Sequence, residues 1–209
     1  MQRRRLLTLS ASAVVLGAVP RLAFAQDVKG EPAQVVSQFA QIGIVQVLQA
    51  NIPKQQKADR FRVLFKQFFD IPAIARFTLG RFWKMAQPDE QTKFLAGFED
   101  VIVYTWTRRF SEYNGQTLQV QSTAPDGNDG ALVSSTIIGK DVQPINVAWR
   151  LRKREDGWRV VDVIVEGISM AVTYRQEYAA ILNQQGGMPG LVTQIQSQAA
   201  DLAKQANAS

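Results

Sequence analysis

One strand-like segment in the last third of the sequence, Val160–Met170, constrains the fold more than any other. The chain runs through Gly167 from this strand into a helical pattern. Both faces of the strand are apolar, with Val161, Val163 and Val165 on one face and Trp158, Val160 and Ile164 on the other. A strand with one face in water would alternate apolar and polar residues. This strand must therefore be covered on both sides, either by the protein or by something apolar that the protein carries.

The first 25 residues have the pattern of a secretory signal. Three arginines, Arg3–Arg5, precede an apolar run over 6–19 that is too short to cross a bilayer, and Ala23-Phe24-Ala25 forms a small-x-small cleavage site. The sequence therefore predicts a signal peptide over 1–25 that is removed after Ala25. The arginines followed by Leu6-Leu7 also fit a twin-arginine signal, so the export route stays open.

Removal of this segment changes the charge balance. Four of the 24 basic side chains lie in residues 1–25, which contain no acid, so the remaining 20 exceed the 18 acidic side chains by two. This balance gives no reason to expect a nucleic acid partner, which would require a clustered basic face. The absence of Cys and His from the sequence excludes disulfides, zinc, haem and His-dependent triads. We expect no metal site, since no calcium-loop pattern occurs either.

Helical periodicity dominates residues 26–115. Apolar residues recur every three to four positions from Pro32 to about residue 50, over 54–69, and in a short segment from Asp70 to Gly80. Pro88-Asp89-Glu90 begins the longest helix, because proline and acids favour the first turn. The middle of that helix is apolar nearly all round, so we expect it to be largely buried.

The period then changes to that of β-strands. Four strand-like runs follow, at about 116–124, 131–139, 145–153 and 158–166, and Asp156-Gly157 favours a hairpin between the last two. After Gly167 the pattern is helical again to about residue 184. A glycine-rich stretch, 186–190, interrupts it before a last amphipathic helix.

This order predicts an α+β fold, in which a curved antiparallel sheet of about four strands is wrapped by helices and forms a cone with one open side. We expect a single domain over 26–209. Its parts would be a helical part (26–115), the sheet (116–167) and the C-terminal helices (168–209).

Two acids of the last strand could take part in chemistry. Asp162 and Glu166 lie on one face, about 13 Å apart by strand rise, which is too far for a paired-carboxylate glycosidase site. A single buried acid can act as a general base, but such acids are more often paired with arginine. Arg76, Arg81 and Arg175 are available from the flanking helices, so we expect structural ion pairs rather than a catalytic site.

Two sequence blocks carry a family resemblance. The first is residues 70–83, Asp-Ile-Pro-Ala-Ile-Ala-Arg-Phe-Thr-Leu-Gly-Arg-Phe-Trp, and the second is residues 157–170, which includes Trp158-x-x-x-Asp162-x-x-x-Glu166-Gly-Ile-Ser. Together with Tyr174-Arg175 they resemble the MlaC family, periplasmic phospholipid-binding proteins also called toluene-tolerance auxiliary proteins of ABC transporters. The resemblance covers roughly residues 34–195. Gly187-Met188-Pro189 departs from the Gly-hydrophobic-Asp that is frequent in relatives, which leaves the start of the last helix open.

The resemblance implies a twisted sheet similar to nuclear-transport-factor-like cones, with an added helical layer. It also implies a monomeric, non-enzymatic carrier in the periplasm that shelters phospholipid acyl tails and needs no cofactor. Its expected partners are an inner-membrane ABC transporter complex and an outer-membrane lipoprotein complex. Three alternatives remain: a hopanoid or other sterol-like cargo, a cone-fold enzyme on a small hydrophobic substrate that uses Asp162 or Glu166 as base, and a protein-binding module.

The expected tail-binding residues come from the last two strands and from the helices that would close the other side. They are Phe77, Phe98, Ile102, Trp106, Ile145, Val147, Trp149, Val161, Val163, Val165 and Ile168. Tails cannot enter a densely packed cone without movement. Since glycine permits the dihedral changes of a hinge, we expect the helices after Gly167 to swing against the sheet, using Gly167, Gly186, Gly187 and Gly190.

Overall fold

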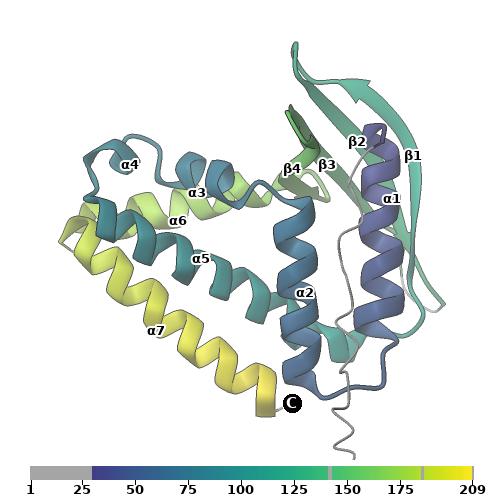
Figure 1. The fold of residues 1–209 in the computed structure, drawn as a ribbon, viewed down its shortest axis with the longest axis horizontal. Coiled ribbons are helices and arrows are strands. Elements are labelled where there is room, and N and C mark those ends of the chain that lie inside the picture. Colours follow the sequence, from purple (N-terminus) through teal and green to yellow (C-terminus); the bar gives the residue numbers. More distant parts are fainter. Residues whose placement is uncertain (1–29, 141–142, 185, 209) are drawn as a thin grey trace, which may run out of the picture.

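A computed structural model describes residues 30–140, 143–184 and 186–208, and the expected signal peptide lies outside these residues. The described chain has the predicted α+β order of helices, then an antiparallel sheet, then helices (Figure 1). Within these residues no helix is both long and apolar enough to cross a membrane.

The first helical part contains five α-helices and two short irregular helical turns. They are α1 (Pro32–Ile42), η1 (Gly43–Leu48), α2 (Lys54–Phe68), α3 (Ile71–Leu79), α4 (Phe82–Met85), α5 (Pro88–Arg109) and η2 (Phe110–Glu112). Local chemistry sets their ends. The Asp70 carboxylate accepts a hydrogen bond from the Ala73 N–H at 3.0 Å, which caps α3 as predicted, and α3 ends at Gly80, whose φ is +52°.

The sheet is an antiparallel meander in the order β1-β2-β3-β4-β5. Its strands are β1 (Thr117–Pro125), β2 (Gly130–Ile138), β3 (Ile145–Arg154), β4 (Gly157–Val165) and β5 (Ile168–Ser169). The four predicted strands are therefore confirmed, and a two-residue fifth strand follows them. The register shifts in β1 between Val120 and Ser122, and again where β3 meets β4. Such bulges increase the local twist, in keeping with the curved, unclosed sheet in Figure 1.

The second shift changes which residues of β4 share a face. Arg150 pairs with Asp162, but the next residue of β3, Leu151, pairs with Val160. Val161 therefore has no partner in β3. The strict alternation expected for Val161, Val163 and Val165 breaks at Val161, because one extra residue in a strand reverses the facing of the residues before it.

The C-terminal part contains α6 (Met170–Gln184) and α7 (Gly187–Ala208). Because α7 begins at Gly187, Gly190 lies inside the helix and not in an interruption. Gly186 and Gly187 have φ values of +79° and +72°, a conformation that favours glycine. Of the four expected hinge glycines, Gly186 thus precedes α7, Gly187 is its first residue, and Gly167, at φ +81°, precedes β5.

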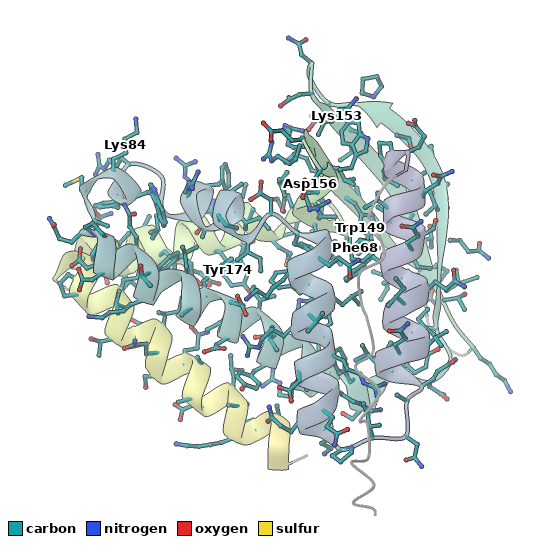
Figure 2. All side chains as sticks on the ribbon, in the orientation of Figure 1. Phe68, Lys84, Trp149, Lys153, Asp156 and Tyr174 are labelled. Carbon is teal, nitrogen blue, oxygen red and sulfur yellow. The ribbon has the colours of Figure 1, made fainter. Side chains whose placement is uncertain are left out.

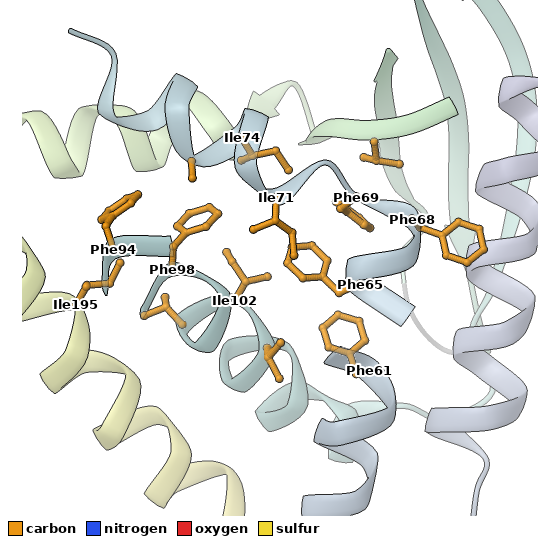
Figure 3. Packing of buried hydrophobic residues seen from close by; sticks show 14 of the residues in the cluster. Phe61, Phe65, Phe68, Phe69, Ile71, Ile74, Phe94, Phe98, Ile102 and Ile195 are labelled. Carbon is orange, nitrogen blue, oxygen red and sulfur yellow. The ribbon is translucent and has the colours of Figure 1, made fainter. Parts of the chain in front are cut away.

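The helices divide into two groups around the sheet (Figure 1). Helix α1 packs along β1 and β2, and α2 stands beside α1. Helices α3 to α7 form a layer that extends away from the β4 edge, with α5 packed along α7 and α3 along α6. One apolar core connects the two groups, and in Figure 3 Phe98 and Ile102 of α5 face Ile71 and Phe65.

Candidate functional site

The inner face of the sheet carries a continuous apolar surface, which we call the sheet wall. The cross-strand pairs Val147–Val165, Trp149–Val163 and Leu151–Val160 place these side chains on one face, and Val165 also pairs with Ile168. The wall consists of Ile145, Val147, Trp149, Leu151, Val160, Val163, Val165 and Ile168.

The sheet wall is buried at one end and exposed at the other. Along β3, Leu151 is fully buried, Trp149 and Val147 are buried, and Ile145 is 39% exposed. On the neighbouring strands Val165 is half-buried and Ile168 is 60% exposed. The wall therefore runs from the protein core out to solvent at the β5 end of the sheet.

A hydrogen-bonded pair keeps the polar groups of the wall satisfied. The Trp149 Nε1–H donates to Ser135 Oγ, and the Ser135 hydroxyl donates to the Val147 carbonyl oxygen, both at 2.9 Å. Ser135 is itself buried. Because the indole and hydroxyl donors are both used, the buried part of the wall presents only apolar surface to the helices.

Aromatic rings from α1 and α2 face the wall. The Phe39 ring lies 5.7 Å from Trp149, 5.6 Å from Phe68 and 5.3 Å from Phe69, measured between centroids. Trp149 and Phe68 occupy the region between the sheet and these two helices (Figure 2). Sequence reasoning missed these rings as candidate lining residues. Their helical spacing indicated a buried face but not which surface that face would meet.

The expected lining residues fall into three groups. Phe98, Ile102, Val147 and Trp149 are buried in the core, and Val161, Val163 and Val165 are half-buried. The remaining residues, Phe77, Trp106, Ile145 and Ile168, are exposed apolar side chains. The Phe77 ring is covered on one side by the guanidinium of Arg175, 5.0 Å from its centroid. The expected lining residues therefore include both buried core side chains and exposed side chains at the surface. Their contact with cargo stays a prediction.

The buried carboxylate of Asp162 does form an ion pair, but its partner is a partly exposed arginine that differs from those expected. Its Oδ2 lies 3.2 Å from Arg150 Nη1 and accepts a hydrogen bond from the Ser169 hydroxyl at 2.6 Å. Its Oδ1 accepts from the Ala171 N–H at 3.0 Å. Sequence spacing could not reveal Arg150 as partner, since cross-strand register brings the two together.

The other residues of the expected ion pairs lie elsewhere. The guanidinium of Arg76 lies over the Trp83 ring and that of Arg81 over the Phe82 ring. Glu166 is exposed in the turn between β4 and β5, where its carboxylate accepts a hydrogen bond from the Asn146 N–H. Its φ of +48° is unusual for a residue other than glycine. Among the described residues Glu166 has no ion pair, so the expected pairing of Glu166 is not observed.

Two surface hollows lie away from the sheet wall. One of about 220 Å³ adjoins the end of α5, near Lys57 and Phe110. Another of about 650 Å³ lies beside the β3–β4 hairpin, near Asp70 and Arg154. The buried part of the wall is instead filled by side chains, so a cargo would have to displace them. In the described part of the chain, no group of three or more acidic side chains is placed to hold a metal ion.

This fold and wall define a class of protein, an open antiparallel sheet whose apolar concave face is covered by helices. The MlaC protein family model matches residues 40–197. The chain therefore belongs to the MlaC family, and the resemblance found in the sequence is confirmed.

Named relatives agree with this assignment. The intermembrane phospholipid transport system binding protein MlaC of Haemophilus influenzae is 27% identical over 125 residues, which is 58% of each chain. Toluene tolerance protein ttg2D of Pseudomonas putida is 24% identical over 106 residues, 51% of this chain and 49% of that protein. The matches thus span only about half of these relatives.

A solved structure shares the fold. The phospholipid-binding protein of Ralstonia solanacearum, determined in complex with a phospholipid, superposes with a TM-score of 0.75 at 21% identity. The match covers 83% of this chain and 99% of that one. At this identity the similarity establishes the fold alone.

Proposed function

We propose that this protein is a lipid carrier that shelters the acyl tails of a phospholipid between the sheet wall and the helices. The observation that carries the proposal is the burial gradient of the wall, from fully buried Leu151 to exposed Ile145 and Ile168. An apolar surface that begins in the core and ends in solvent suits an amphiphile with its tails inside and its head group in water. The names of the relatives support the same cargo.

The energetics favour such shelter without any catalytic group. Two acyl tails expose several hundred Å² of apolar surface, and burial of this area contributes on the order of 10 kcal/mol at about 25 cal/mol per Å². Asp162 is a poor candidate for a general base, because its carboxylate already accepts hydrogen bonds from Ser169 and Ala171 and pairs with Arg150. We therefore infer that the protein is not an enzyme.

The remaining parts of the proposal concern location and partners. We infer that residues 1–25 direct export to the periplasm and are removed after Ala25, leaving a single lipid-binding domain over 26–209. The carrier would act as a monomer. It would exchange phospholipid with an inner-membrane ABC transporter complex and an outer-membrane lipoprotein complex, since transport between membranes requires a donor and an acceptor.

We call the region between the sheet wall and the helices the tail-binding space. Two glycine joints would allow this space to open. Gly115 lies between α5 and β1 with φ +81°, and Gly167 lies between β4 and β5 with the same φ. A Cβ built at either position would have no heavy atom within 4 Å, so neither glycine is needed for close packing. We propose that α5, α6 and α7 of the helical layer rotate against the sheet at these two joints. The proposed joints keep Gly167 from the expected hinge of Gly167, Gly186, Gly187 and Gly190 and add Gly115.

A vesicle transfer experiment tests the function. Donor vesicles carry a fluorescent phospholipid with a quencher, and acceptor vesicles carry neither. The protein without residues 1–25 should accelerate transfer in proportion to its concentration, and heat-denatured protein should not. A transfer rate equal to that of vesicles alone would contradict the proposal.

A further inference from the structure

A buried hydroxyl in the helical layer has no partner. Tyr178 of α6 is 3% exposed, and its hydroxyl makes no hydrogen bond with any described residue. Its surroundings are aromatic: the ring centroid lies 5.4 Å from Phe94, 6.3 Å from Phe98 and 5.9 Å from Tyr174. Burial raises the pKa of Tyr178 above that of a free tyrosine, so the hydroxyl remains a hydrogen-bond donor. Buried donors are rarely left without an acceptor, because the loss of water is not compensated.

The position of this hydroxyl relates it to the tail-binding space. Phe98, which contacts the Tyr178 ring, is one of the residues expected to line that space. Side chains on a helix lean toward its N-terminus, so the Tyr178 side chain extends from its Cα toward the start of α6, the direction in which the Tyr174 ring stacks on it. The start of α6 follows β5 directly, where Ile168 forms the exposed end of the sheet wall.

The chemistry of a diacyl phospholipid supplies one kind of group for such a donor. Acyl chains cannot accept a hydrogen bond, and the charged phosphate is strongly favoured in water. The ester carbonyl oxygens lie between these two regions and are acceptors that carry no donor. A single neutral donor in an apolar environment therefore complements an ester group, whereas a phosphate would require cationic partners.

We propose that the Tyr178 hydroxyl donates a hydrogen bond to an ester carbonyl oxygen of the bound lipid, and so makes the carrier selective for ester-linked over ether-linked phospholipids. This inference depends on the proposed function. It assigns Tyr178 as a specificity-determining residue, which goes beyond apolar shelter of the tails.

A competition between two matched lipids tests the assignment. The protein without residues 1–25 is equilibrated with equal amounts of a diacyl and a dialkyl ether phospholipid of the same head group and chain length. Native mass spectrometry then gives the ratio of the two complexes. For the unsubstituted protein we expect an excess of the diacyl complex of about two- to tenfold, the range for one net hydrogen bond. Tyr178→Phe should lower this ratio to near one.

Tyr174→Phe is the matched control, because it removes a hydroxyl one turn away that is not fully buried. This variant should keep the preference for the diacyl lipid. Tyr178→Phe should also melt at the same temperature as the empty parent protein or higher, since it deletes an unpaired buried donor. A melting temperature several degrees lower would mean that the hydroxyl has a partner within the protein, and would overturn the proposal.

The remaining outcomes separate this proposal from the proposed function. Equal binding of both lipids by the parent protein would overturn the role of Tyr178 and leave the carrier function intact. A preference that persists in Tyr178→Phe would do the same, as expected if a buried water satisfies the hydroxyl. Binding of neither lipid would contradict the carrier function and this inference together.

Discussion

The carboxylate of Asp162 on β4 accepts a hydrogen bond from the backbone N–H of Ala171 at 3.0 Å and so holds the first turn of α6 to the sheet. The first N–H groups of a helix have no partner within the helix, and the positive end of its dipole favours an anion there. Ser169 contributes to the same cap, because its hydroxyl accepts from the Val172 N–H and donates to Asp162. The proposed joint at Gly167 is therefore followed, two to four residues later, by side-chain and backbone hydrogen bonds that hold the start of α6 to the sheet.

Asp162→Asn should lower stability without removing lipid binding. The buried Asp162 carboxylate accepts hydrogen bonds from Ser169 and Ala171 and pairs with Arg150. We expect its replacement to lower the free energy of unfolding by about 1–3 kcal/mol. This range allows for solvent screening of the ion pair, because Arg150 is partly exposed. Asp156→Asn is the control. Asp156 forms an ion pair with Arg159, and the Asp156 side chain is exposed to solvent. Loss of this ion pair should lower the free energy of unfolding by about 0.5 kcal/mol or less. Denaturant unfolding measures the stability of both variants relative to the parent protein. If Asp162→Asn unfolds at the same denaturant concentration as the parent protein but no longer transfers lipid, Asp162 instead acts directly in lipid transfer.

Ile168→Glu should abolish lipid binding while the fold remains intact. Ile168 is already 60% exposed, so a carboxylate there is solvated in the empty protein, but bound tails would have to desolvate it. Val63→Glu provides a matched change at another exposed apolar position, on α2 outside the sheet wall. Solvent extraction gives the amount of lipid bound to each purified variant, and circular dichroism spectra show whether each variant is folded. If Ile168→Glu retains the usual amount of lipid, the exposed end of the wall does not contact cargo.

The sequence predicted the order of elements well because each carries its own local signal. The cap at Asp70, the proline at the start of α5 and the hairpin at Asp156-Gly157 are local chemistry, and all appear where expected. The bulge at Val161 has no such signal, since it arises from how β3 and β4 pair. For the same reason the alternation of apolar residues predicted the wrong face for part of β4.

The site was less predictable than the fold because it depends on long-range contacts. The pairing of Asp162 with Arg150 follows from strand register, and an arginine from a flanking helix was equally plausible from the sequence. Phe39 lies 110 residues before Trp149 in the chain, and only the tertiary fold brings their rings together. The side of a buried helix can be read from its periodicity, but the surface that it meets cannot.

A crosslink between α5 and α7 should leave lipid exchange unchanged. A Cβ built at Gly97 lies 3.6 Å from the Cβ of Ile195, within the range of disulfides, and the chain has no other cysteine. Because these helices pack so closely, we expect them to move as one body. Gly97→Cys combined with Ile195→Cys should therefore transfer lipid equally fast when oxidised and when reduced. Slower transfer by the oxidised form would show that α7 moves relative to α5 during exchange.

Alkaline conditions should destabilise the protein partly through Tyr174. Burial raises its pKa from 10.0 to about 12, so between these values the folded protein holds a proton that the unfolded chain releases. Stability from this group is fully present below pH 10.0 and is lost as the pH rises toward 12. Denaturant unfolding at about pH 9 and about pH 11 should show a smaller loss for Tyr174→Phe than for the parent protein. An identical loss in both proteins would contradict the assigned shift.

Native mass spectrometry of protein exported by its own leader and purified without detergent tests the central claim most directly. The account predicts a polypeptide mass that begins at Gln26, together with a complex heavier by the mass of a phospholipid. Collisional activation should release that lipid, and solvent extraction of the same sample should recover it. Repeated recovery of only the empty polypeptide, with no lipid in the extract, would contradict the account.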